Sequence, residues 1–196
     1  QAQILLEKLP PDHPERSRVE RIEQAAQRCR KIVRALLDFA REKNYVFELC
    51  NINSLISDTL NFCETEIHSA NIELVLNIPE SLPEIYVSPH HIQQVFLNII
   101  NNAIDAMRLK GGKLFITAKT NNNYVDVSFR DTGIGIAKEN LNHVFDPFWT
   151  TKDIGKGTGL GLTVSYGIIQ RHKGKITAFS DGEGKGAEFV VSLPVK

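Results

Sequence analysis

The first forty residues carry the apolar pattern of a long helix. Apolar side chains recur every three or four residues, at Val19, Ile22, Ala26, Cys29, Val33, Leu36 and Ala40. One helix cannot bury such a stripe alone. Ile4–Leu6 predicts the end of a preceding helix, and Pro10, Pro11 and Pro14 predict a turn between the two. An ordinary helix pair and half of a dimerising helical hairpin both fit, and the sustained spacing favours the hairpin.

From Tyr45 onward, short strand patterns mix with helical ones. Strands are expected at 45–50, 72–78, 84–87, 113–119, 124–130, 175–179 and 188–193. Helices are expected at 51–69, 88–108 and 160–171, with a short one before residue 145. Asn51 or Asn53 and the pair Ser88-Pro89 are helix starts, and Gly111-Gly112 is a stop. The irregular order predicts one mixed sheet with helices on one face, a two-layer α/β sandwich. The domains expected are therefore a helical part, 1–43, and an α/β part, 44–196.

Composition narrows the possible partners and compartments. The 196 residues include 23 basic and 23 acidic ones, so no net charge favours nucleic acid or an acidic membrane. No run of about 18 apolar residues predicts a membrane span. Three cysteines without a Cys-x-x-Cys motif argue against disulfides or zinc and favour a reducing compartment, the cytoplasm. The chain has neither a starting Met nor a signal peptide, so we expect a fragment.

The expected helix 88–108 has an unusual polar face, made of Gln94, Asn98, Asn101, Asn102 and Asp105. Its apolar face consists of Val95, Phe96, Ile99, Ile100, Ala103, Ile104 and Met107. A face of this kind can simply be solvated. However, Asn is a poor helix former, so a face built of amides indicates that its carbonyl oxygens are used. Asn98 and Asn102 lie one turn apart, and two amide oxygens suit Mg²⁺ together with phosphate oxygens and water.

A second candidate group is the acidic residue at the end of the strand 124–130. Strand alternation places Val125, Val127, Phe129 and Asp131 on the core face. An ionised Asp131 there needs a donor, and the exocyclic amino group of a purine would supply one. Gly133 and Gly135 would let the backbone turn close to a ligand. The alternative is a turn with a capping Asp.

A glycine-rich segment, 155–162, precedes the last expected helix. Its backbone N–H groups and the helix N-terminus can hold an anion. The spacing is neither that of the Gly-x-x-x-x-Gly-Lys phosphate loop nor that of the dinucleotide fingerprint. Just before it, Phe145, Phe148 and Trp149 belong either to the core or to a docking lid or partner surface. Lys152 and Lys156 could reach phosphates as point charges.

The order of these segments resembles the catalytic region of two-component sensor histidine kinases, within the gyrase, Hsp90 and MutL group of ATPases. The resemblance covers 47–195. Asn98 and Asn102 match the N box, 131–135 the first glycine box, 145–148 the F box and 157–162 the second glycine box. Residues 147–152 resemble the nitrogen-regulation-like branch. Residues 19–41 resemble the second helix of the dimerisation and phosphotransfer hairpin.

This resemblance implies a Bergerat-type fold that holds ATP between helices and a lid, with Mg²⁺ on Asn98 and Asn102. It implies catalysis by positioning and charge neutralisation, with Asn98 and Lys152 as catalytic residues. The implied nucleotide-binding residues are Asn98, Asn102, Asp105, Asp131, Gly133, Gly135, Ile136, Phe145, Lys152, Gly157, Thr158, Gly159, Leu160, Gly161 and Leu162. The implied partners are the parent kinase's phosphoacceptor helix, a response regulator and, through 15–43, a second copy. The parent would be cytoplasmic, or membrane-anchored with this part in the cytoplasm.

The sequence departs from the family pattern in two ways. None of its histidines lies in the acceptor motif, so we expect the chain to begin after the acceptor and to bind ATP without phosphorylating itself; they are His13, His68, His90, His91, His143 and His172. Ala187 stands where the family often has Thr, which removes one contact near the purine.

The residue at position 98 bears on the reaction type. Hydrolysing relatives carry Glu at the place of Asn98, and an amide cannot take a proton from water, which favours transfer. The alternatives are an ATPase or serine kinase of the same superfamily, and a dimerising module without nucleotide binding.

Overall fold

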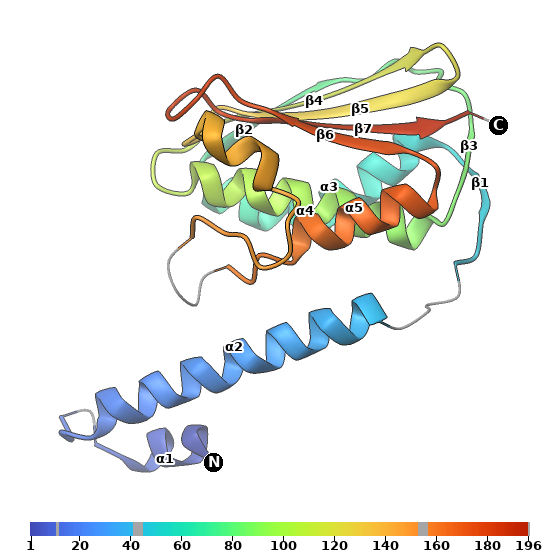
Figure 1. Ribbon diagram of the computed structural model, residues 1–196. Helices are drawn as coiled ribbons and strands as arrows, with labels where there is room; N and C mark the ends of the chain where they lie inside the picture. The colour runs from blue at the N-terminus through green and yellow to red at the C-terminus, as the bar shows by residue number, and fades with distance from the viewer. Residues whose placement is uncertain (11, 41–44, 153–156, 196) are drawn as a thin grey trace. The chain divides into compact units, whose positions relative to one another are not determined.

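The computed structural model describes residues 1–10, 12–40, 45–152 and 157–195, and Figure 1 traces them. The chain divides into two compact units. The first comprises Gln1–Lys43 and Pro147–Leu160, and the second comprises Asn44–Asp146 and Gly161–Lys196. Among the helices in the described ranges, none combines the length and the apolar character needed to cross a bilayer.

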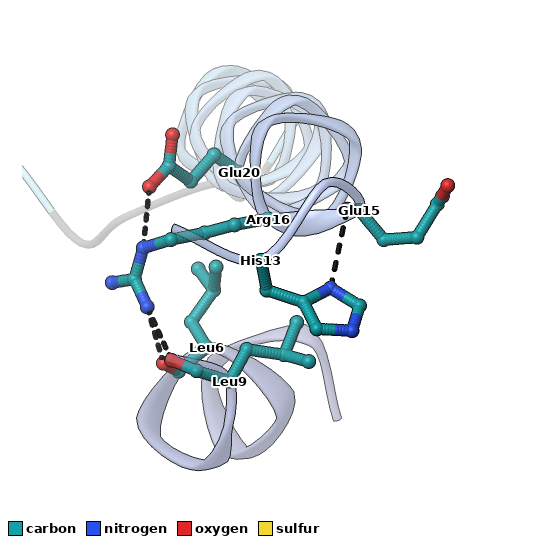
Figure 2. A network of polar contacts seen from close by, with 6 residues as sticks. All are labelled: Leu6, Leu9, His13, Glu15, Arg16 and Glu20. Carbon is teal, nitrogen blue, oxygen red and sulfur yellow. Dashed lines mark hydrogen bonds and ion pairs between the residues drawn. The ribbon is translucent and has the colours of Figure 1, made fainter. Parts of the chain in front are cut away.

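The first unit contains a helical hairpin of α1 (Ala2–Lys8) and α2 (Arg16–Ala40), as the sequence predicts. Arg16 joins the two helices (Figure 2): its Nη1 donates to the carbonyl oxygens of Leu6 (3.0 Å) and Leu9 (2.7 Å), and its Nε pairs with Glu20 (3.2 Å). Carbonyls at a helix C-terminus lack intrahelical partners and carry partial negative charge, so a cation is favourable there. In the turn, His13 Nδ1 accepts from the Glu15 N–H at 3.2 Å.

The second unit is a two-layer α/β sandwich, which confirms the predicted fold class. Its five-stranded sheet has the order β2 (Ile72–Asn77), β4 (Gly112–Asn121), β5 (Tyr124–Asp131), β7 (Glu188–Pro194) and β6 (Lys175–Phe179). The β2–β4 pairing is parallel and the β4–β5, β5–β7 and β6–β7 pairings are antiparallel, so the sheet is mixed. Three helices cover one face (Figure 1), namely α3 (Ile52–Ser69), α4 (Pro89–Met107) and α5 (Gly161–Arg171). The short helix η1 (Lys138–His143) is a 3₁₀ turn.

The prediction of one continuous sheet is wrong for two short strands. β1 (Glu48–Cys50) and β3 (Ile85–Val87) pair antiparallel in a separate two-stranded sheet. Alternation of inward and outward residues predicts a strand but does not name its partner. The predicted strand 45–50 also begins late, at Glu48; before it, the ring of Tyr45 stacks on that of His91, and the ring of Phe47 lies tilted against that of His172.

The core lies between the sheet and the three helices. The predicted apolar face of α4 is buried, and the ring of Phe96 lies 5.1 Å from that of Phe129 on β5. Asn51 caps α3, because its side chain accepts from the N–H groups of Asn53 and Ser54. Pro89 opens α4, although Ser88 Oγ pairs with His91 Nδ1 (2.8 Å) rather than capping the helix. The helical periodicity of its apolar residues therefore orients α4 with its polar side away from the core.

Candidate nucleotide-binding site

The amide edge, which we define as Asn98, Asn102 and Asp105, runs along the polar side of α4. These residues are spaced by four and three positions, so they share one side of the helix. Seven residues of α-helix span about 10 Å. Asn98 and Asn102 are half-buried and Asp105 is exposed. Side chains that carry oxygen atoms therefore line one side of α4 over a length of about 10 Å, which is enough to contact a small ligand.

At one end of the amide edge, Asn98 is bonded to α5. Its Nδ2 donates to Gly161 O (3.0 Å) and to Ser165 Oγ (3.1 Å). A backbone carbonyl only accepts hydrogen bonds, so the atom facing it must be the amide nitrogen. This leaves Oδ1 as the atom of Asn98 that can meet a cation. Because α5 begins at Gly161, this end of the edge lies at the positive end of a helix dipole.

Asp131 lies at the inner end of β5, buried to 5% exposure as predicted. Its Oδ1 accepts from the backbone N–H groups of Gly133 (2.8 Å) and Ala187 (3.3 Å). Burial raises the pKa of the Asp131 carboxyl, and these backbone hydrogen bonds partly oppose that rise. Within the described part of the chain, both of these hydrogen bonds go to Oδ1, which leaves Oδ2 for a further donor. The backbone N–H of Ala187 can make this hydrogen bond whatever side chain the residue carries, but Ala lacks the hydroxyl that a Thr at this position would have.

The turn after Asp131 lies against the other end of the amide edge. The Ile134 N–H donates to Ala106 O, next to Asp105, at 3.2 Å. A Cβ on Gly133 would lie 2.7 Å from the same oxygen, so only glycine permits this approach. Two of the predicted motifs, the one on α4 and the one that begins at Asp131, are therefore in contact. Asn98 is hydrogen-bonded to α5, and Ala106 is hydrogen-bonded to the turn after Asp131.

A second glycine-rich turn, 182–186, supports the Asp131 turn. Gly186 N–H donates to Gly133 O (3.2 Å), and Ser180 Oγ accepts from the Ile136 N–H (3.0 Å). Gly186 has φ +72°, and a Cβ there would overlap the Asp131 carbonyl oxygen. Gly135 lies against Gly182, and Ile136 is half-buried against the core. The sequence reasoning missed this support, for which the glycine repeat at 182, 184 and 186 was an available signal.

Phe145 anchors the point where the chain leaves the second unit. Its ring lies 5.7 Å from that of Tyr166 and 6.5 Å, edge-on, from that of Phe189. The carbonyl oxygen of Phe145 accepts from Thr163 Oγ1 at 3.1 Å, and this hydrogen bond connects the segment at Phe145 to the first turn of α5. Of the three predicted aromatics, Phe145 therefore packs against the core, as does Leu162.

The remaining predicted residues lie in Pro147–Leu160, which belongs to the first unit. They are Lys152, Gly157, Thr158, Gly159 and Leu160. The Phe148 N–H donates to Gly159 O (3.0 Å), so this segment closes on itself as a loop. Lys152 N–H donates to Thr150 Oγ1 (3.1 Å). Their part in nucleotide binding stays a prediction, and Gly155 and Lys156 lie outside the described residues.

Two of the histidines are structural. His172 Nε2 accepts from the Ser88 N–H (3.0 Å), and Nδ1 pairs with Ile168 O (2.8 Å), so the ring is neutral with its proton on Nδ1. Burial lowers the pKa of His172. His91 stacks on Tyr45, with ring centroids 3.8 Å apart. Both join the residues after 44 to the ends of α4 and α5.

The fold is that of a family of ATPases. Residues 87–196 match the family described as histidine kinase-, DNA gyrase B-, and HSP90-like ATPase, and the chain belongs to that family, within it to the histidine kinases. It is 36% identical over 171 residues to sporulation kinase E of Bacillus subtilis (87% of this chain, 23% of the relative). It is likewise 36% identical over 170 residues to sensor histidine kinase ZraS of Escherichia coli K12 (87% and 36%). It therefore spans about a quarter to a third of the length of these relatives.

Solved structures show the same fold. The catalytic domain of histidine kinase ThkA is 32% identical, with a TM-score of 0.67 over 76% of this chain and 96% of that one. ThkA in complex with the response regulator protein TrrA has a TM-score of 0.77 at 28% identity, over 96% and 54%. Full-length ShkA in complex with AMPPNP has a TM-score of 0.75 at 25% identity, over 97% and 41%.

Proposed function

We propose that this chain is the ATP-binding catalytic part of a sensor histidine protein kinase. It transfers the ATP γ-phosphoryl group to a histidine, from which the group passes to an aspartate of a response regulator. The observation that carries the proposal is the amide edge of α4, held between the N-terminus of α5 and the Asp131 turn. The names of the curated relatives support the reaction class.

The adenine end of ATP is assigned to Asp131. A carboxylate whose Oδ1 is used by two backbone N–H groups presents Oδ2 to a single further donor. The exocyclic amino group of adenine is such a donor, and a hydrogen bond to a charged acceptor is stronger than a neutral one. The phosphates are assigned to the Asn98 end, where the α5 N-terminus favours negative charge.

The residues present fit Mg²⁺. Among the described residues, no group of three or more His, Cys, Asp or Glu could hold a metal by itself. Two carboxamide oxygens would suit an ion that takes its other ligands from phosphates and water. When bound, Mg²⁺ would supply charge neutralisation on the phosphates. Asn98 and Asn102 would orient it, and Lys152 would add a positive charge near the transferred group.

Transfer is favoured over hydrolysis at this site. Hydrolysis needs a base that takes a proton from water, and the side chain of Asn98 is an amide whose nitrogen is committed to Gly161 and Ser165. An ATPase is therefore the weaker alternative. A serine kinase of the same superfamily differs only in the acceptor, and a dimerising module without nucleotide binding would leave the amide edge unexplained.

The partners follow from the same proposal. We assign 1–43 to a partial dimerisation and phosphotransfer hairpin and 44–196 to the catalytic domain. Exposed apolar side chains on the hairpin support a homodimer, with Ile22 exposed to 61% and Val33 to 54%. The ThkA–TrrA complex supports a response regulator as partner. The proposed compartment is the cytoplasm.

Calorimetry of the chain with Mg-ATP tests the proposal. Saturable binding is expected, together with a melting temperature that rises with nucleotide, since ligand at a hundred times its Kd stabilises by about 2.7 kcal/mol. Phosphate release without an acceptor should stay far below that of an ATPase, and phosphate passed to an added acceptor should be acid-labile, as phosphohistidine is. Absence of both binding heat and thermal shift would refute the proposal, and acid-stable phosphoserine would favour the serine kinase.

A further inference from the structure

Ser165 lies outside the residues to which the sequence assigned a role, yet it contacts the amide edge directly. It is fully buried on α5. Its Oγ donates to Gly161 O (2.9 Å) and accepts from Asn98 Nδ2 (3.1 Å). The second hydrogen of Nδ2 goes to the same Gly161 O (3.0 Å). These three residues form a closed set of hydrogen bonds that joins α4 to α5.

This set selects one orientation of the Asn98 amide. A carboxamide turned by 180° keeps its shape but exchanges its donor for its acceptor. The Ser165 hydroxyl donates its hydrogen to Gly161 O, so in this arrangement it can only accept a hydrogen bond from Asn98. A turned amide would set Oδ1 against the Gly161 carbonyl oxygen, which can only accept, and it would make Ser165 give up its hydrogen bond to Gly161 in order to donate to Oδ1. The observed hydrogen bonds of both partners therefore favour nitrogen on the α5 side.

The orientation leaves Oδ1 accessible at the start of α5. A Cβ on Gly161 would lie 3.8 Å from Asn98 Oδ1, in ordinary contact, and glycine leaves that space open. We propose that Ser165 is a positioning residue that holds Asn98 with Oδ1 toward the magnesium-bound phosphates. This role rests on the proposed function, but the orientation itself can be observed without nucleotide.

The first test compares Ser165→Ala with the wild-type chain. Calorimetry gives the ATP dissociation constant in Mg²⁺ and in EDTA. Loss of one neutral hydrogen bond predicts Mg-ATP binding about three- to tenfold weaker, with binding in EDTA unchanged. Ser165→Cys, which keeps the volume but has a weak acceptor, should show the same trend if the alanine variant does not fold. In the nucleotide-free protein, the side-chain amide protons of Asn98 should exchange faster with water in both variants.

Thr59→Ala is the matched control. Thr59 is also fully buried, and its Oγ1 donates to the carbonyl four residues earlier, Leu55 O, at 2.6 Å, but this hydrogen bond lies within α3 and not between α4 and α5. It should lower the melting temperature and leave both dissociation constants unchanged.

A double-mutant cycle separates positioning from packing. In an Asn98→Ala background, Ser165→Ala should have no further effect on Mg-ATP affinity, because the oriented group is gone. Equal effects of Ser165→Ala with and without Asn98 would overturn the inference, as would an unchanged Mg²⁺-to-EDTA ratio in a folded variant. Wild-type protein that does not bind Mg-ATP would refute the proposed function and this role with it, whereas wild-type binding with an inert Ser165 overturns the positioning role alone.

Discussion

The substitution Asp131→Asn should remove the proposed contact with adenine while keeping the hydrogen bonds that Asp131 makes within the fold. Asparagine has the shape of aspartate, and its Oδ1 can still accept from the Gly133 and Ala187 N–H groups. Only the other atom changes, from the acceptor Oδ2 to a donor NH₂. The amino group of adenine would then face a second donor.

The cost to binding follows from these contacts. A hydrogen bond to a charged group contributes about 1.5–3 kcal/mol, and a buried donor without a partner costs about 1–3 kcal/mol more. The sum of about 2.5–6 kcal/mol predicts Mg-ATP binding weaker by about sixtyfold or more.

Asp131→Asn should weaken nucleotide binding but should not lower the stability of the nucleotide-free protein. Burial raises the pKa of Asp131, so this group favours folding below pH 3.8, and that contribution is lost as pH rises through its folded pKa. At pH 7 the buried charge is therefore a cost that the neutral amide removes. Scanning calorimetry should show an unchanged or higher melting temperature for Asp131→Asn.

Asp126→Asn is the control on the same strand. Asp126 is also buried, but its Oδ2 accepts from Asn121 (3.0 Å) and it points to the other face of the sheet. It should leave nucleotide affinity unchanged. Asp131→Asn protein that binds Mg-ATP within threefold of wild type would refute the assignment of adenine. A melting temperature well below that of wild type would refute the argument about the buried charge.

Two further predictions concern the supports of the site, and a third concerns its reaction. Gly186→Ala should lower the urea midpoint strongly, because its Cβ overlaps the backbone of Asp131, whereas Gly184→Ala, at φ +73° with open space around it, should cost only about 1–2 kcal/mol. Since burial lowers the pKa of His172, its contribution to stability is complete above pH 6.5 and declines as pH falls toward its folded pKa. His172→Gln, which can still accept from Ser88, should flatten that decline in urea titrations, and identical slopes would contradict it. Phosphate release from ATP alone should stay near background in a coupled assay, and steady turnover would favour the ATPase alternative.

Much of the fold could be predicted because its signals are local. The apolar face of α4 repeats with the helical period, so burial of that face follows from the sequence alone. The inward position of Asp131 likewise follows from alternation along β5. The partner of β1 could not be predicted, because a three-residue strand carries too little pattern to select among sheet edges.

The sequence by itself therefore determined which residues could do chemistry here, since amide oxygens, a strand-end carboxylate and glycines are properties of residue type and spacing. Only the tertiary structure decided which groups they contact. The direction of the Asn98 amide depends on Ser165, 67 residues away, and the backbone partner of Asp131 comes from Ala187, 56 residues away. Hydrogen-bond polarity between distant segments leaves no periodic trace in a sequence, because it is selected by the packing of α4 on α5 and of β5 on β7.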